Sequence, residues 1–437
     1  MEYTVHDFGS YKLYMIKTNK FKTITTRISF RTSIKKEEIT IRNVLCEMFT
    51  QSSKNYPSKR SLAIKAEDLY NVDIMSRNSR LGNYMSTDIY LETLHDKYTE
   101  EGNFESALEF FKEIVFNPDI NNKSFNKDKL NIVKNQASDS LNSLKEQPTY
   151  YSLIRMFEEL DDSPSSYRMV GYKEDLDKIT ETDLYDYYNK MIKTNLVDIF
   201  VIGDIDFDKT KEMIQKYIKI NTLKKEKTPY VLNPKKPRLK INYKSEKVNN
   251  SQSKLSIACL VNNLSTYERN YPLTLCNIIF GGGVDSKLFK QVREEKSLCY
   301  TINSVPNKLD NLLIIRAGIA SENCKQTIKV IEKCLDEMKK GKFTEDDINV
   351  AKEFYKTALD DIEDNETQIM EDYFLSKTID TDTIDIKRQK MKEVTKDEII
   401  AVAKKIKIDT VFLLEGDQNE WDSNEWSWKD NIWRKVR

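Results

Sequence analysis

The chain has 437 residues, 39% hydrophobic and 32% charged, which is typical of a soluble protein long enough to bury ordinary cores. Lysine plus arginine equals aspartate plus glutamate at 70 each, so no net charge attracts nucleic acid or acidic membranes. No apolar run approaches the roughly 20 residues of a membrane-spanning helix. The first residues lack the basic start and apolar core of a signal peptide, so we expect a cytoplasmic protein without nucleic-acid or membrane partners.

The cysteines sit mostly in apolar segments and form no Cys-x-x-Cys pair. Such cysteines are typical of reduced, buried thiols in a cytosolic protein, so no structural disulfide is expected. They are Cys46, Cys259, Cys276, Cys299, Cys324 and Cys334.

The first half opens with a predicted strand at residues 27–33, in which Ile28 and Phe30 alternate with polar residues. Thr180 is a good N-cap, with an acid in the following turn. Helical patterns occur within residues 40–58, 105–116, 125–141 and 179–192, and an apolar strand from residue 197 ends in Gly-Asp.

A lysine- and proline-rich stretch at residues 222–240 interrupts these periodic signals. We predict an extended linker there, because proline disfavours both helix and central strand. It divides the chain into an N-terminal half, 1–221, and a C-terminal half, 241–437.

The second half repeats the order of the first. A buried strand is predicted at residues 253–261, and Thr395 precedes its helix as Thr180 does. Further helices are predicted at residues 326–340, 343–359 and 394–407, and an apolar strand from residue 409 again ends in Gly-Asp. We therefore predict a duplicated α+β fold, with helices on one face of each sheet; two unrelated α+β domains are the alternative.

Residues 280–304 combine a glycine triplet, a short helix and a strand. Gly281–Gly283 precede the helix as in a phosphate loop, but that pattern requires Gly-Lys-Ser/Thr, and here the lysine follows Ser286. We expect a structural loop instead, in which positive φ or a close backbone approach favours glycine. Asp285 or Ser286 can cap the helix.

In that helix, Leu288, Phe289 and Val292 form an apolar face, and Arg293 lies at its margin. In the strand that follows, we expect Tyr300 to share one side with Leu298 and Ile302, because side chains alternate along a strand.

Arg293 and Tyr300 both donate hydrogen bonds without needing a metal, which suits gripping a peptide carbonyl. The alternative is a surface Arg293 paired with Glu294 or Glu295, beside a packed Tyr300.

The string Gly-Gly-Gly, Ser-x-Leu-Phe, Val-Arg-Glu, Ser-Leu-x-Tyr at residues 281–300 resembles the C-terminal halves of pitrilysin/insulinase-type zinc peptidases and their mitochondrial-processing-peptidase relatives. The duplicated layout extends the resemblance along the chain. It implies an α+β fold of two homologous halves with antiparallel-rich sheets, of the LuxS/MPP-like metallohydrolase type. It also implies that Arg293 and Tyr300 bind substrate.

This chain departs from that family at the zinc motif. Active members hold zinc with a His-x-x-Glu-His helix, and alignment on the Tyr56-Pro57 turn places the motif at residues 43–47. These five residues are Asn43, Val44, Leu45, Cys46 and Glu47. They cannot replace two histidines, and one thiolate does not make a three-ligand site.

The family's later glutamate ligand falls at Asn135 or Gln136, which are neutral amides and poor zinc ligands. His6 and His95 lack a second histidine, a cysteine or a suitably spaced carboxylate, and are expected to be surface or hydrogen-bonded histidines. We therefore expect no metal ligand and no cofactor in this chain.

All tryptophans fall in the last seventeen residues, within a charged tail. Large aromatic residues often anchor interfaces, but we favour an extension folded over its own domain. They are Trp421, Trp426, Trp428 and Trp433.

The resemblance implies a substrate-binding, non-catalytic subunit of a two-chain zinc peptidase, in which a homologous partner carries the zinc and cuts a peptide or protein substrate. The rival hypothesis is a scaffold that keeps the peptidase fold and has lost proteolysis.

Overall fold

The computed structural model describes residues 1–437 except 222–227, 380, 417–425, 430–431 and 436–437. The chain forms two compact units, each drawing segments from both halves of the sequence. Unit 1 comprises Met1–Asn142, Arg168–Tyr230 and Ile362–Asp380, and unit 2 comprises Ser143–Tyr167, Val231–Asp361 and Thr381–Arg437.

Unit 1 is built on a six-stranded sheet of order β1-β2-β8-β3-β5-β4. Only the β2–β8 pairing within this sheet is parallel. Its strands are β1 Glu2–Asp7, β2 Lys12–Lys17, β3 Thr23–Ser33, β4 Asp73–Leu81, β5 Tyr84–Leu94 and β8 Leu196–Gly203, with a small β6 Ile120–Asn121, β7 Ser124–Phe125 hairpin. Its helices are α1 Ile39–Met48, α2 Lys59–Asp68, α3 Asn103–Phe116, α4 Lys127–Asn142, α6 Lys173–Leu176, α7 Glu181–Thr194, α8 Phe207–Tyr217 and α13 Glu366–Thr378.

Unit 2 is built on a five-stranded sheet of order β11-β12-β10-β13-β9, in which β13 and β9 are parallel. Its strands are β9 Asn242–Val248, β10 Ser253–Val261, β11 Cys299–Asn307, β12 Leu312–Ile319 and β13 Ile406–Gly416, with a separate pair β14 Trp426–Lys429 and β15 Ile432–Lys435. Its helices are α5 Pro148–Glu158, α9 Thr266–Asn270, α10 Pro272–Gly281, α11 Cys324–Lys339, α12 Glu345–Glu363, α14 Ile384–Glu393 and α15 Lys396–Lys405.

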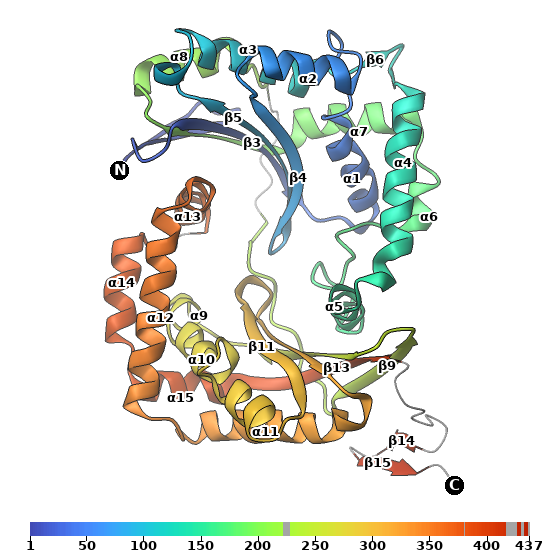
Figure 1. Cartoon of the computed structure of the whole chain (residues 1–437), viewed down its shortest axis with the longest axis vertical. Helices are drawn as coiled ribbons and strands as arrows, with labels where there is room; N and C mark the ends of the chain where they lie inside the picture. Colours follow the sequence, from blue (N-terminus) through green and yellow to red (C-terminus); the bar gives the residue numbers. More distant parts are fainter. Residues whose placement is uncertain (222–227, 380, 417–425, 430–431, 436–437) are drawn as a thin grey trace. The chain divides into compact units, whose positions relative to one another are not determined.

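Apart from β1, the two sheets have the same topology, which confirms the predicted α+β fold of two related halves. Counted from β4, unit 1 runs β4-β5-β3-β8-β2, and counted from β11, unit 2 runs β11-β12-β10-β13-β9. In both series the last pair is parallel and the others are antiparallel. Figure 1 shows both sheets and their helices.

Helix starts agree with the sequence signals. The Thr180 hydroxyl accepts the Asp183 N–H, and the Asp183 carboxylate accepts the Thr180 N–H at 3.0 Å, which closes a capping box at α7. Thr395 and Glu398 form the same arrangement at α15.

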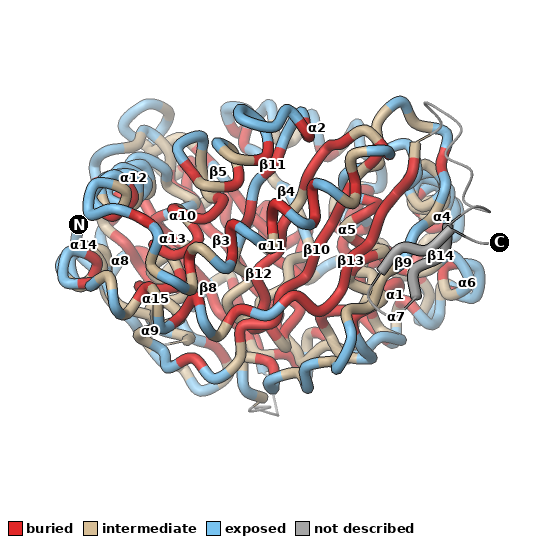
Figure 2. The backbone as a smooth tube through the Cα atoms, turned by 90° about the horizontal axis from the view of Figure 1, so that it is seen from below, coloured by how far each residue is buried: buried red, intermediate tan, exposed pale blue. Residues whose placement is uncertain are grey.

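Each sheet packs one face against its main apolar core. The unit 1 core includes Ile28, Phe30 and Val201, and the unit 2 core includes Ile257 and Leu313. Figure 2 shows that long stretches of the central strands are buried. All six cysteines are free and buried, as the sequence predicts.

The opposite face of each sheet carries one helix from the other half of the sequence, which the sequence does not reveal. On unit 1, α13 packs against β8, and Arg27 on β3 donates to Glu371 at 2.6 Å. On unit 2, α5 packs against β10 and β13, and Arg155 donates to Glu246 at 3.0 Å. We call α5 and α13 the exchanged helices.

The tryptophan-rich tail is described in part. Strand β14 pairs antiparallel with β15, and Trp428 lies opposite Trp433. Trp421 lies outside the described residues, so the role of the tail stays a prediction.

Candidate functional site

The residues at the position of the zinc motif fit a structural helix. On α1, the Asn43 amide donates to the Met169 carbonyl at 2.8 Å and accepts from Asn78 at 2.7 Å. Cys46 is buried, and burial raises the pKa of its thiol to about 12, which keeps it protonated at neutral pH and makes it a poor metal ligand. Glu47 is exposed. These side chains do not form a zinc site.

The later ligand position and the histidines do not supply a zinc site either. Asn135 and Gln136 are exposed on α4. His6 pairs with the Thr4 hydroxyl at 3.3 Å, and His95 accepts the Lys97 N–H at 2.9 Å. Among the described residues, no group of three or more His, Cys, Asp or Glu side chains is suited to a metal ion.

The glycine triplet allows a close approach rather than a positive φ. None of the three glycines has positive φ. A Cβ on Gly281, at the end of α10, would lie 2.5 Å from Ser304 Oγ and 2.7 Å from Leu288 Cδ1. Ser304 in turn donates to Asn277 at 2.7 Å, so α10 lies directly on β11.

The helix after the triplet is a π-helical turn, Phe289–Glu294, which we call the π segment. Ser286, rather than Asp285, caps it, because the Ser286 hydroxyl accepts the Phe289 N–H at 3.4 Å. The Glu295 N–H donates to Lys290 O at 2.9 Å, five residues back. Such turns are rare and frequently occur at functional sites.

The π segment is fixed to the core and to α11. Val292 is fully buried in the unit 2 core. Gln291 donates to the Glu337 carboxylate on α11 at 2.8 Å, and Lys287 pairs with the same carboxylate at 3.2 Å. The backbone that carries Arg293 is therefore held from two sides.

Arg293 itself is exposed and has no ion pair among the described residues, so it does not pair with Glu294 or Glu295. Its guanidinium carbon lies 4.5 Å from the centroid of the Phe289 ring. Phe289 is half-buried, whereas Val292 is buried, and the Phe289 ring makes a cation–π contact with the guanidinium.

Tyr300 does not share a side with Leu298 and Ile302, so that expectation is wrong. Cys299 lies opposite Ile319 and Thr301 lies opposite Gly318, which leaves Tyr300 as the extra residue of a β-bulge. A bulge re-aims a side chain. Tyr300 is 67% exposed, whereas Ile302 is 6% exposed, so Tyr300 is not packed in the core.

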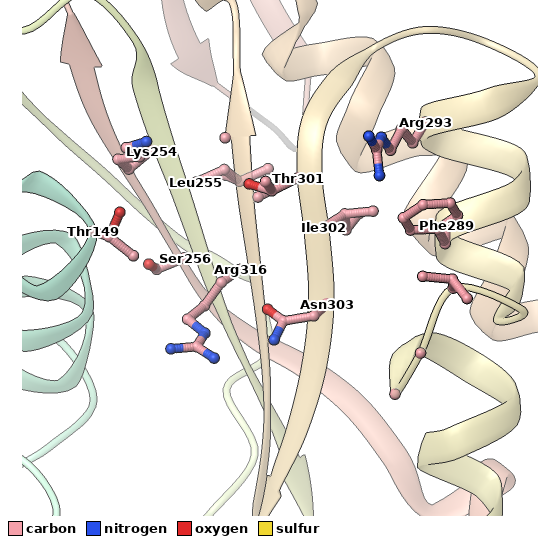
Figure 3. A pocket seen from close by; sticks show the side chains of 15 residues that line it. Thr149, Lys254, Leu255, Ser256, Phe289, Arg293, Thr301, Ile302, Asn303 and Arg316 are labelled. Carbon is pink, nitrogen blue, oxygen red and sulfur yellow. The ribbon is translucent and has the colours of Figure 1, made fainter. Parts of the chain in front are cut away.

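A cavity of about 450 Å³ lies beside the π segment, with its floor on the face of the unit 2 sheet that also carries α5. Two polar rows cross β10, β12 and β11, one of Lys254, Gly318 and Thr301 and the other of Ser256, Arg316 and Asn303. Figure 3 shows Lys254 and Thr149 on one side of the cavity and Arg293 with Phe289 on the other. Tyr300 is not part of the lining.

Sequence reasoning identifies Arg293 but misses Lys254, Arg316 and Gly318. Their rows form only when three strands pair. The one local signal is Arg316, a single charge within the otherwise apolar strand β12.

Comparisons with known proteins place this site in a family. Residues 178–355 match the family model described as the Peptidase M16 inactive domain. A Bacillus subtilis (strain 168) protein, "Probable inactive metalloprotease YmfF", is 26% identical over 417 residues, covering 94% of this chain and 97% of that protein. Through these matches the chain resembles the pitrilysin/insulinase-type M16 peptidases, and it lacks their zinc motif.

Solved structures agree with the M16 fold. A conserved protein from Enterococcus faecalis V583 superposes with a TM-score of 0.89 at 26% identity, covering 96% of this chain and all of that one. The peptidase M16 inactive domain from Pseudomonas fluorescens gives a TM-score of 0.76 at 17% identity, covering 96% and 99%. In the described part of this M16 homologue, no helix has both the length and the apolar character to cross a bilayer.

Proposed function

We propose that this chain is the non-catalytic, substrate-binding subunit of a heteromeric zinc-dependent peptidase, and that it supplies Arg293 and Tyr300 to a homologous zinc-bearing partner. The observation that carries the proposal is the position of Arg293. The family motif delivers this residue, without an ion pair among the described residues, to the lining of a cavity in a chain whose own zinc positions hold amides and a buried thiol.

The geometry of Tyr300 supports the same role. Its bulge leaves the phenol exposed on β11, which is an edge strand of the unit 2 sheet. An exposed phenol and an unpaired guanidinium can both donate hydrogen bonds to peptide carbonyls. Hydrolysis itself would be the work of a zinc-activated water on the partner.

Reconstitution tests the proposal. The chain is co-expressed with each His-x-x-Glu-His homologue encoded in the same genome, and complexes are isolated through a tag on this chain. We expect one such homologue to co-purify and to hydrolyse a peptide library at least tenfold faster in the complex than alone. A zinc-bearing homologue that neither binds this chain nor gains activity from it would contradict the proposal.

The scaffold function is the second candidate, and the loss of every zinc ligand favours it. A relative over nearly the whole chain also bears the word inactive in its name. A stable complex with unchanged hydrolysis would support the scaffold function.

A further inference from the structure

The cavity beside the π segment is lined by cations without acids. Lys254, Arg293 and Arg316 all line it, and no aspartate or glutamate belongs to the lining. The chain as a whole has equal numbers of acidic and basic residues, and many of its lysines and arginines are paired. The lining therefore differs from the average surface of the protein.

None of these three side chains has an anionic partner among the described residues. The Arg316 side chain makes no hydrogen bond or ion pair there, and the Arg293 guanidinium lies over the Phe289 ring without either. Lys254 donates to the neutral Gln252 side chain. Burial lowers the pKa of Lys254, which shows that its charge is desolvated without a compensating carboxylate.

At the centre of the floor, oxygen atoms of Gln252 and Thr301 occupy the place that a side chain on Gly318 would take. Gly318 lies between Lys254 and Thr301, so its row has no side chain in the middle. A Cβ on Gly318 would lie 2.7 Å from Gln252 Oε1 and 3.0 Å from Thr301 Oγ1. In the neighbouring row, Arg316 lies between Ser256 and Asn303, which add a hydroxyl and an amide donor.

We propose that this cavity binds a carboxylate of the peptide substrate, and that the chain thereby selects acidic peptides. The proposal rests on the peptide-binding function proposed above and adds the chemical class of its ligand. A guanidinium recognises a carboxylate through two parallel hydrogen bonds, and such charge-assisted bonds are about twice as strong as neutral ones. The carboxylate belongs either to an Asp or Glu side chain or to the peptide C-terminus.

Fluorescence anisotropy on the full chain, without a partner, tests the proposal and distinguishes the two sources. Labelled decapeptides differ in one central residue, Glu or Gln, and each is prepared with a free or an amidated C-terminus. We expect at least one replacement of a carboxylate by an amide to weaken binding five- to fiftyfold. A central Glu/Gln difference assigns the site to side chains, and an acid/amide difference assigns it to the terminus.

Variants locate the effect. Arg316→Gln is expected to remove most of the preference, and Asn303→Asp, which adds a carboxylate beside Arg316, is expected to reduce it without removing a cation. Arg60→Gln is the matched control, because Arg60 is exposed on α2 and outside the cavity. Thermal unfolding checks that each variant folds.

Equal binding of all four peptides would overturn the carboxylate proposal while leaving peptide binding intact. A preference that persists in both Arg316→Gln and Asn303→Asp would also overturn it. Absence of binding up to 1 mM peptide would overturn it too, whereas the subunit function would still be decided by the reconstituted complex.

Discussion

Arg293 is held in place by its surroundings and is left free at its charged end. Val292 anchors the backbone in the core, Glu337 fastens the π segment through Gln291, and Phe289 supports the guanidinium. A guanidinium placed in this way can hydrogen-bond a ligand without first breaking an ion pair, so less of the binding energy is lost.

Arg293→Ala and Tyr300→Phe are expected to lower processing by the complex without unfolding this chain. If each side chain hydrogen-bonds a substrate carbonyl, its loss costs about 1–3 kcal/mol, roughly a five- to hundredfold fall in kcat/KM. Steady-state kinetics with a zinc-bearing partner measures the effect. Rates within twofold of wild type, with the complex intact, would show that the pair is structural.

The purified chain is expected to contain no stoichiometric zinc. The α1 positions offer an amide, a protonated thiol and a single exposed carboxylate, which cannot make a three-ligand site. Metal analysis after mild purification checks this. About one zinc per chain that disappears in Cys46→Ala or Glu47→Gln would contradict the prediction.

The sequence predicts only those site residues that lie close together along the chain. Arg293 and Phe289 lie on one turn, and a short motif identifies them. The alternation of a regular strand places Tyr300 on the wrong side, because one bulge residue reverses that alternation. Lys254 and Arg316 lie on separate strands, and nothing in either segment specifies their register.

At the scale of elements, the contact of α10 with β11 depends on one missing side chain. Gly281→Ala is expected to destabilise the protein by about 1–3 kcal/mol, because the new Cβ overlaps Ser304 and Leu288 in a packed region. Gly283→Ala is the matched control, since its Cβ would meet only Phe354, at 3.9 Å. Urea unfolding compares them, and equal midpoints for the two variants would refute the packing argument.

The docking of α13 on unit 1 is expected to depend on pH through Glu366. Burial raises the pKa of Glu366 from 4.5 to about 7, while the hydrogen bond from Thr23 partly offsets the shift and the Glu92 charge adds to it. The docked state therefore binds the proton more tightly than the unfolded chain. Its stabilising contribution is complete below pH 4.5 and is lost as pH rises through 7.

Glu366→Gln mimics the protonated carboxyl and should be more stable than wild type at pH 8 by about 1–3 kcal/mol, with little difference at pH 5. Thermal unfolding at both pH values measures this. Asp361→Asn, an exposed acid just before unit 1's third segment, serves as the control. A stabilisation of Glu366→Gln that is equal at both pH values would exclude the proton linkage.

The sequence predicts individual helices and strands better than it predicts which sheet a helix packs against. The threonine caps of α7 and α15 and the apolar strands β8 and β13 follow from local patterns. The exchanged helices α5 and α13 do not, because an amphipathic pattern shows which side of a helix is buried but not which sheet buries it.

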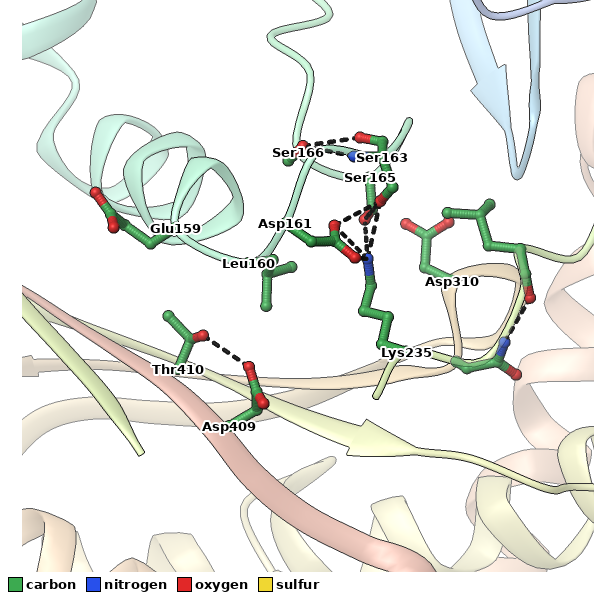
Figure 4. A network of polar contacts seen from close by, with 12 residues as sticks. Glu159, Leu160, Asp161, Ser163, Ser165, Ser166, Lys235, Asp310, Asp409 and Thr410 are labelled. Carbon is green, nitrogen blue, oxygen red and sulfur yellow. Dashed lines mark hydrogen bonds and ion pairs between the residues drawn. The ribbon is translucent and has the colours of Figure 1, made fainter. Parts of the chain in front are cut away.

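At the scale of the whole molecule, part of the segment that joins the two halves of the sequence is held by side-chain contacts. Lys235 donates to the Asp161 carboxylate at 2.7 Å and to Ser163 and Ser165, so residues near Lys235 are tied to unit 2 (Figure 4). The Tyr230 ring stacks on Tyr84 in unit 1. The lysine-rich residues 222–227 precede both attachments along the chain.

A protease site inserted within residues 222–227 should allow cleavage into two fragments that stay together. Each fragment would contribute an exchanged helix to the other fragment's unit, α5 to unit 2 and α13 to unit 1. Size-exclusion chromatography after cleavage should show a single species of unchanged size. Phe374→Asp on α13 should weaken this association, because Phe374 packs with Phe200 and Ile369 in an apolar cluster. Fragments that separate without denaturant would contradict the prediction.

The positions of the exchanged helices in the sequence determine when each sheet can be covered during synthesis. Helix α5 leaves the ribosome before the sheet of unit 2 that it covers, whereas the last strand of the unit 1 sheet, β8, ends 163 residues before α13 begins (203 to 366). At about 5–20 residues per second, the unit 1 sheet is therefore without α13 for roughly 8–33 s. Throughout that time Tyr14, Ile16, Phe200 and Ile202 lack the helix that buries them. We therefore expect the nascent N-terminal half to expose these apolar side chains until α13 is made, and a chain truncated before residue 366 to expose them permanently.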